Sequence, residues 1–197
     1  MRFQLRGKVI FFATNNVNKF NEARKVLSRY KIAVGMLRVK TLEIQSESLR
    51  EIAENSVIHA FKQCNLPVIV EDAGLFTEAL NGFPGPYASY VYKTIGNHGL
   101  LKLLKGVENR KARFRSAVAF LSEDFESPKC FEGEVEGEIT ETVRTGCSGF
   151  GFDPIFKPVK SEKTFAEMTI DEKNRYSHRA HAFRKFARWY KTLKAST

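Results

Sequence analysis

The chain has 197 residues, 43% of them hydrophobic and 27% charged, a size and balance that fit one globular domain, here residues 1–197, with a substantial core. No apolar run is long enough to span a membrane, residues 1–8 lack signal-peptide architecture, and three cysteines without metal-ligand spacing favour a reducing cytoplasm over a disulfide framework. The net charge of +10 fits nucleic-acid binding, a phosphate-rich small molecule or a solvated basic face, and we assign most of the lysines and arginines to the last.

The first predicted unit is a strand, a polar loop and a helix. Val9–Ala13 is a continuous apolar run, as in strands buried on both faces, and residues 20–30 carry apolar side chains at helical spacing. The loop between them ends at a helix N-terminus, where free N–H groups and the helix dipole attract anions. Thr14 and Asn16 can add side-chain donors, and Lys19 adds a cation for a phosphate. A simple helix cap explains the same residues equally well.

A second extended segment is predicted over Met36–Gln45, with Glu43 near its end. Ser48 and Glu51 form the pattern of a capping box, with serine at the cap and glutamate three residues later. The helix that they begin runs to about Asn65 and buries one apolar side, so we interpret it as scaffold.

Two adjacent carboxylates follow the next predicted strand. Val68–Val70 is a β-branched run that we expect to end at Glu71 and Asp72. Acids at the C-terminal end of a buried strand lie where α/β sheets open a ligand crevice. A pair of acids there favours a divalent cation, because two like charges otherwise resist ionising together. The alternative is a strand end capped by solvated acids.

The second half of the chain begins with a short helix within Gly96–Gly106 and a predicted antiparallel pair, Arg113–Leu121 with Cys130–Ile139. In the second of these strands, four glutamates alternate with apolar or small residues: Glu132, Glu134, Glu136 and Glu138. Because alternate residues of a strand share one face, we interpret these glutamates as a solvated face and not as a metal site.

The stretch Gly146–Pro154 combines glycines with two aromatic residues, Phe150 and Phe152. Glycines let a backbone approach a ligand closely, and an aromatic face can stack on a planar base. A turn whose phenylalanines fill the core is the alternative. The last helix follows Ser177, a predicted N-cap, and it brings His178 and Arg179 to its entrance, where they can face a pocket.

Together these stretches resemble the inosine triphosphate pyrophosphatase family, whose members hydrolyse non-standard purine nucleoside triphosphates. The resemblance covers nearly the whole chain in the expected order. It rests on Thr14-Asn15-Asn16 with Lys19, Glu43, Glu71 to Leu75, Ala79 to Tyr87, Gly149 to Pro154, Thr164 to Met168, and Lys173-Asn174 with Ser177-His178-Arg179.

The resemblance implies a two-lobed α/β fold with a long mixed central β-sheet flanked by helices, an active-site cleft between the lobes, and a homodimer. It also implies a Mg²⁺-dependent reaction in which ITP, dITP or XTP and water give the monophosphate and pyrophosphate. Glu43 and Asp72 would hold Mg²⁺, and Asp72 would also activate water, with Glu71 as a supporting catalytic acid.

The resemblance further implies a set of substrate contacts. The loop Thr14, Asn15, Asn16 and Lys19, together with Lys173, would contact phosphates, and Ala73 would lie beside the substrate. Phe152 would stack on the purine within the segment Phe150-Gly151-Phe152, while Asp153, His178 and Arg179 would surround the polar edge of the base. A donor facing the 6-oxo group would select against the 6-amino group of ATP, because buried polar groups would then lose their partners.

Two positions depart from the family pattern. Ala73 stands where the family often has serine or threonine, and Ile58 or His59 falls near a frequent phosphate-facing lysine of the second helix. Three alternatives stay open: a related pyrophosphatase for modified pyrimidine triphosphates, a basic nucleic-acid-binding protein, and a scaffold without catalysis. No helix-turn-helix, RNP or zinc signature is present, so we expect no specific nucleic-acid partner.

Overall fold

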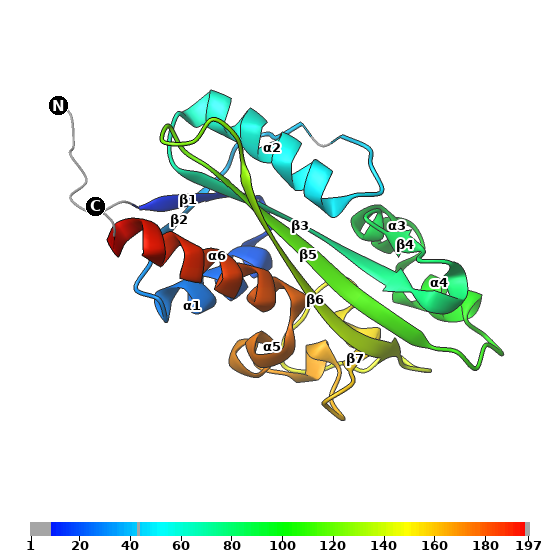
Figure 1. The fold of residues 1–197 in the computed structure, drawn as a ribbon. Coiled ribbons are helices and arrows are strands. Elements are labelled where there is room, and N and C mark those ends of the chain that lie inside the picture. The colour runs from blue at the N-terminus through cyan, green and yellow to red at the C-terminus, as the bar shows by residue number, and fades with distance from the viewer. Residues whose placement is uncertain (1–8, 43, 196–197) are drawn as a thin grey trace.

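A computed structural model of the chain describes residues 9–42 and 44–195, and it shows one seven-stranded sheet with helices on both faces (Figure 1). The strands are β1 (Ile10–Ala13), β2 (Val34–Leu37), β3 (Val68–Thr77), β4 (Pro84–Gly85), β5 (Lys111–Leu121), β6 (Lys129–Ile139) and β7 (Phe156–Pro158). The helices are α1 (Val17–Ser28), α2 (Leu49–Cys64), α3 (Ala88–Thr94), α4 (Gly96–Leu103), α5 (Ile170–Tyr176) and α6 (His178–Ala195). The predicted mixed α/β class is confirmed.

The sheet changes from parallel to antiparallel at β3. Its order is β2-β1-β3-β5-β6-β7; β1 is parallel to β2 and β3, whereas β3, β5, β6 and β7 are antiparallel to their neighbours. On the edge away from β5, β3 pairs with β1 only at Val68 and Ile69, and with β4 only at Leu75 and Phe76. The edge of β3 between these two contacts is therefore not covered by either strand.

The core is divided into three clusters along the long strands. Ile69 and Val118 pack with the buried residues of α1 and α6, whereas Val68 and Val70 pack with α2 on the other face. A third cluster, which includes Leu75 and residues of α3, α4 and β7, lies at the far end of β3, β5 and β6. This division agrees with a two-lobed shape in which the long strands run through both lobes (Figure 1).

The predicted antiparallel pairing of β5 with β6 is confirmed, and the four glutamates of β6 are exposed, as predicted. Arg50, Arg113, Arg115 and Lys157 form ion pairs with three of them. On the other face of β6, α6 approaches so closely that a Cβ on Gly133 would lie 2.2 Å from the carbonyl oxygen of His178. Only glycine fits at this crossing.

Two predicted strand boundaries and one predicted capping interaction are wrong. β3 does not end before Glu71 but continues to Thr77, because β5 pairs with it over its whole length. β2 spans Val34–Leu37 and not Met36–Gln45; Glu43 lies outside the described residues. Ser48 caps α2 by accepting from the N–H of Glu51, but the Glu51 carboxylate accepts from the Ser46 hydroxyl instead of closing a capping box.

In the part of the chain that the structure describes, no helix is long and apolar enough to cross a membrane.

Candidate active site

A cleft of about 1320 Å³ opens at the uncovered edge of β3. It brings together most of the predicted site residues: Thr14, Asn15, Asn16, Lys19, Glu71, Asp72, Ala73, Phe150, Gly151, Phe152, Asp153, His178 and Arg179. Lys173 does not line it, and Glu43 is not among the described residues. The cleft forms here because β1 stops at Ala13 while β3 runs on.

Glu71 and Asp72 lie in the middle of β3, and successive strand residues point to opposite faces of a sheet. Glu71 follows the alternation of Ile69 and faces the side of α1 and α6, while Asp72 follows Val68 and Val70 toward the side of α2. The two acids are therefore not the side-by-side pair that the sequence suggested.

Glu71 is buried among three partners. Its Oε1 accepts from the Ser116 hydroxyl at 2.6 Å and from Arg179 Nε at 3.0 Å, and its Oε2 lies 3.0 Å from Lys19 Nζ. Burial alone would raise the pKa of Glu71, but Arg179 and Lys19 hold that pKa far below the ordinary value. Glu71 therefore stays ionised at neutral pH and anchors the two cations beside the cleft.

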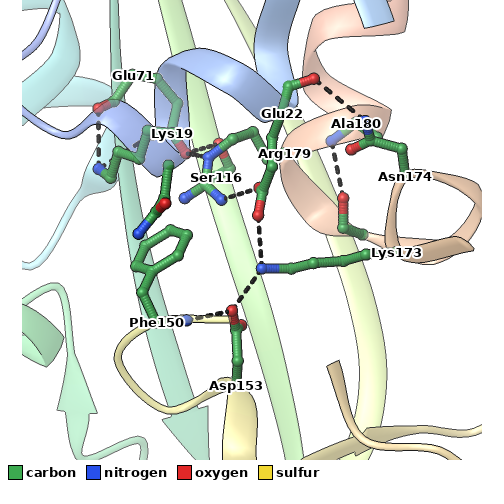
Figure 2. A network of polar contacts seen from close by, with 12 residues as sticks. Lys19, Glu22, Glu71, Ser116, Phe150, Asp153, Lys173, Asn174, Arg179 and Ala180 are labelled. Atoms are coloured by element: carbon green, nitrogen blue, oxygen red, sulfur yellow. Dashed lines mark hydrogen bonds and ion pairs between the residues drawn. The ribbon is translucent and has the colours of Figure 1, made fainter. Parts of the chain in front are cut away.

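A polar network continues from Arg179 into the interior (Figure 2). Arg179 Nη1 lies 2.6 Å from Glu22, and Lys173 Nζ lies 2.7 Å from Glu22 and 2.6 Å from Asp153. All four side chains are at most 4% exposed, so each buried charge is offset by an opposite one. Lys173 thus ties two carboxylates together beneath the cleft, and this geometry gives no support to a phosphate contact by Lys173.

The network also sets the protonation tendencies of its acids. Burial would raise the pKa of Glu22, but Lys173 and Arg179 bring it below its ordinary value. Burial raises the pKa of Asp153, and nearby Glu22 adds to the rise against the opposing effect of Lys173. Burial and Arg179 lower the pKa of His178, which is therefore a neutral imidazole at pH 7.

His178 lies flat against Phe114, with ring centroids 4.7 Å apart and ring planes inclined by 11°. Its side chain is 2% exposed, and its Nδ1 has no hydrogen-bond partner in the described part of the chain. Ser177 caps α6, since its hydroxyl accepts from the N–H of Ala180, as predicted.

The loop before α1 is organised as a helix cap. The side chain of Asn16 accepts from the N–H groups of Asn18 and Lys19, and the hydroxyl of Thr14 accepts from the N–H of Asn16. Several donors that an anion would use are thus occupied. The Lys19 ammonium reaches Glu71, at both its carboxylate and its carbonyl oxygen.

The two phenylalanines of the glycine-rich segment differ in exposure. Phe152 is 3% exposed and meets Tyr92 edge-to-face, with ring centroids 5.6 Å apart. Phe150 is only half-buried; Lys173 and Arg179 place their cationic groups 4.8 Å and 5.5 Å from its ring centroid. Phe150 therefore offers more ring surface to a base than Phe152 does.

Sequence reasoning missed Glu22 and the cleft-facing part of α3. Glu22 lies one turn after Lys19, beside Ala23 on the buried side of α1. A charged residue at a buried position of a helix usually has a partner, and this was the signal that the sequence offered. Helix α3 lines the cleft along its whole length, from Ala88 to Thr94.

The chemistry of the cleft suits a metal that arrives with phosphates. In the described residues no group of three His, Cys, Asp or Glu side chains gathers as a metal site. Mg²⁺ is commonly held by one or two carboxylates plus substrate phosphates, and Asp72 supplies one carboxylate in the cleft. Asp72 and the phosphates of a nucleotide thus fit Mg²⁺ without an all-protein cage.

Comparison with known proteins gives consistent matches. The model of the Ham1 family matches residues 10–189. Proteins named dITP/XTP pyrophosphatase are 50% identical in Methanopyrus kandleri, over 92% of this chain and 96% of that one, and 49% identical in Hyperthermus butylicus, over 94% and 96%.

The fold is similar to that of the Staphylococcus aureus Ham1 protein, with a TM-score of 0.81 and 31% identity, over 94% of this chain and 100% of that one. A Coxiella burnetii HAM1 protein gives a TM-score of 0.80 and 29% identity, over 96% and 99%.

Proposed function

This chain belongs to the Ham1 family, and on that premise we propose that it hydrolyses dITP, ITP and XTP to the monophosphate and pyrophosphate. The observation that carries the proposal is the identity of about half of all positions to relatives named dITP/XTP pyrophosphatase. The chain is accordingly an enzyme, a hydrolase of nucleoside triphosphates, and the cleft at β3 is the candidate site of its reaction.

We assign the chemistry to Asp72 and the supporting geometry to Glu71. Asp72 lies at the uncovered edge of β3, where its carboxylate can accept a proton from the attacking water. Mg²⁺ held by Asp72, by phosphate oxygens and, as the family resemblance implies, by Glu43 would offset charge on the phosphates and the leaving pyrophosphate. Glu71, ionised and bound to Lys19 and Arg179, positions those cations and does not exchange protons near neutral pH.

Base recognition is proposed for the opposite side of β3. Phe150 is the stacking partner that the exposures favour, with Phe152 behind it in the core. Arg179 binds carboxylates through Nε and Nη1, and its Nη2 has no partner among the described residues. That nitrogen can donate a hydrogen bond to the 6-oxo group of the base. The 6-amino group of adenine is itself a donor, so Arg179 Nη2 would have no acceptor there and ATP would bind less well.

A homodimer, which the family resemblance implies, and a cytoplasmic location, which the cysteine pattern favours, stay predictions.

The test is pyrophosphate release from ITP, dITP, XTP, GTP, ATP and dTTP, with Mg²⁺ and with EDTA. We expect metal-dependent release from ITP, dITP and XTP, slow release from ATP and GTP, and no release by an Asp72→Asn variant that unfolds at the same urea concentration as the wild type. Preferred turnover of dTTP would replace the purine assignment by the pyrimidine one. Release of pyrophosphate from none of the six nucleotides would overturn the proposal.

A further inference from the structure

Helix α3 borders the cleft along its whole length. The buried side chains of α3 are Ala88 and Val91, whereas Tyr92 turns to Phe152, whose ring centroid is 5.6 Å away. Residues three and four apart in a helix share a face, so Ser89 lies on the same flank as Tyr92 and Lys93. All residues of α3 from Ala88 to Thr94 are in the lining of the cleft, and Lys93 is an exposed one, next to Tyr92.

The charges that line the cleft are largely paired. The described lining contains three cations: Lys19, Lys93 and Arg179. Lys19 is bound to Glu71, and Arg179 is bound to Glu71 and Glu22. Lys93, by contrast, has an exposed side chain without an ion pair or hydrogen bond to any described residue.

A triphosphate brings several negative charges, which one divalent cation offsets only in part. Lys19 and Arg179 can offer little further compensation, because the carboxylates bound to them already balance their charges. The cleft therefore needs a cation that is not already paired, on a stem long enough to follow the phosphates.

We propose that Lys93 is this cation and that it binds the phosphate chain of the substrate. The inference deepens the proposed function and depends on it for the identity of the nucleotide. It adds a phosphate contact on α3 to the contacts that the family resemblance implies for the loop before α1. A flexible ammonium at the end of α3 stabilises the phosphates most strongly where water is excluded from the filled cleft.

The test uses binding as well as turnover. Lys93→Ala, Lys93→Arg and, as a matched control, Lys102→Ala are compared; Lys102 is an exposed lysine in the last turn of α4 and does not line the cleft. Calorimetry measures the Kd of inorganic triphosphate with Mg²⁺ and, separately, the Kd of IMP. Steady-state kinetics give KM and kcat for dITP.

Lys93→Ala should weaken triphosphate binding by about tenfold and raise the KM for dITP by a similar factor, since a lost contact to a charged group has that order of effect. Lys93→Arg should restore most of the affinity, IMP should change by less than about twofold, and Lys102→Ala should match the wild type.

Unchanged triphosphate binding in Lys93→Ala would overturn the assignment. Equal losses for triphosphate and IMP would also overturn it, because they would indicate a general disturbance of α3. Binding of inorganic triphosphate does not depend on which nucleotide is hydrolysed. A chain without nucleotidase activity but with Lys93-dependent triphosphate binding would therefore refute the proposed function and keep the role of Lys93.

Discussion

The substitution Glu22→Gln tests whether the polar network is a major source of stability. Glu22 is 4% exposed and lies between two cations, with Oε1 2.7 Å from Lys173 Nζ and Oε2 2.6 Å from Arg179 Nη1. Glutamine keeps the shape of the side chain but removes its charge. Each buried cation would then keep one carboxylate partner in the network: Lys173 would keep Asp153, and Arg179 would keep Glu71.

Removing one partner of a buried ion pair typically costs 3–5 kcal/mol, because the other charge stays buried without compensation. Glutamine retains one acceptor oxygen, and Lys173 and Arg179 each keep a second carboxylate, so we expect a loss of about 3 kcal/mol in the free energy of unfolding. Domains of this kind have roughly 5–15 kcal/mol in total, so the effect is large.

The pH dependence gives the prediction a sign. The pKa of Glu22 lies below its ordinary value of 4.5, held there by Lys173 and Arg179 against the effect of burial. Its contribution to stability is therefore present above about pH 4.5 and is lost as pH falls through the lower pKa of the folded state. Glutamine does not titrate, so the difference in free energy of unfolding between the variant and the wild type should become smaller below pH 4.5.

Urea unfolding at pH 7 and at about pH 4 measures both effects. The matched control is Asp171→Asn, which removes an exposed acid paired with Lys25 and Arg29 and should change stability far less. The network would lose its assigned importance if Glu22→Gln were no more destabilising than this control. A difference that stayed constant between the two pH values would refute the assignment to the Glu22 charge.

Three further substitutions separate chemistry, base binding and packing. Asp72→Asn should abolish turnover of dITP while the chain stays folded; retained turnover would remove Asp72 as the catalytic base. Phe150→Ala should raise KM with kcat little changed, whereas Phe152→Ala should cost about 3 kcal/mol of stability in urea unfolding, and equal stability losses would contradict this division. Gly133→Ala should lower stability by about 2 kcal/mol, because the new Cβ meets the backbone of α6, and an unchanged urea midpoint would refute that contact.

The elements that the sequence predicted well are those whose periodicity reflects local burial. The β5–β6 pair followed from alternation, and α2 followed from an apolar stripe behind Ser48. The predicted end of β3 was wrong for a physical reason. Charged residues usually mark a strand's end, yet Glu71 stays buried inside β3 because Arg179, which is 108 residues away in the chain, neutralises it.

The same long-range pairing limited the prediction of the site. Glu22 gave only the weak signal of a charge beside the apolar stripe of α1, and Lys173 resembled a free cation of α5. Only the fold shows that they pair with each other across 151 residues of sequence. The loop residues and the segment Phe150–Asp153 were found because turn-rich and glycine-rich stretches carry their signal locally.

The position of Glu71 and Asp72 on consecutive residues of one strand explains how two acids can take the separate roles proposed for them. Strand alternation turns Glu71 toward Lys19 and Arg179, where it stays ionised, and turns Asp72 toward the other face of β3. Because β1 and β4 leave this edge of β3 uncovered, both faces open into the same cleft. A nucleotide lying across the edge can thus have its base near Arg179 and its phosphates near Asp72. An insertion of one residue before Glu71 would exchange the faces of Glu71 and Asp72, and with them the proposed anchor of the two cations and the proposed catalytic base.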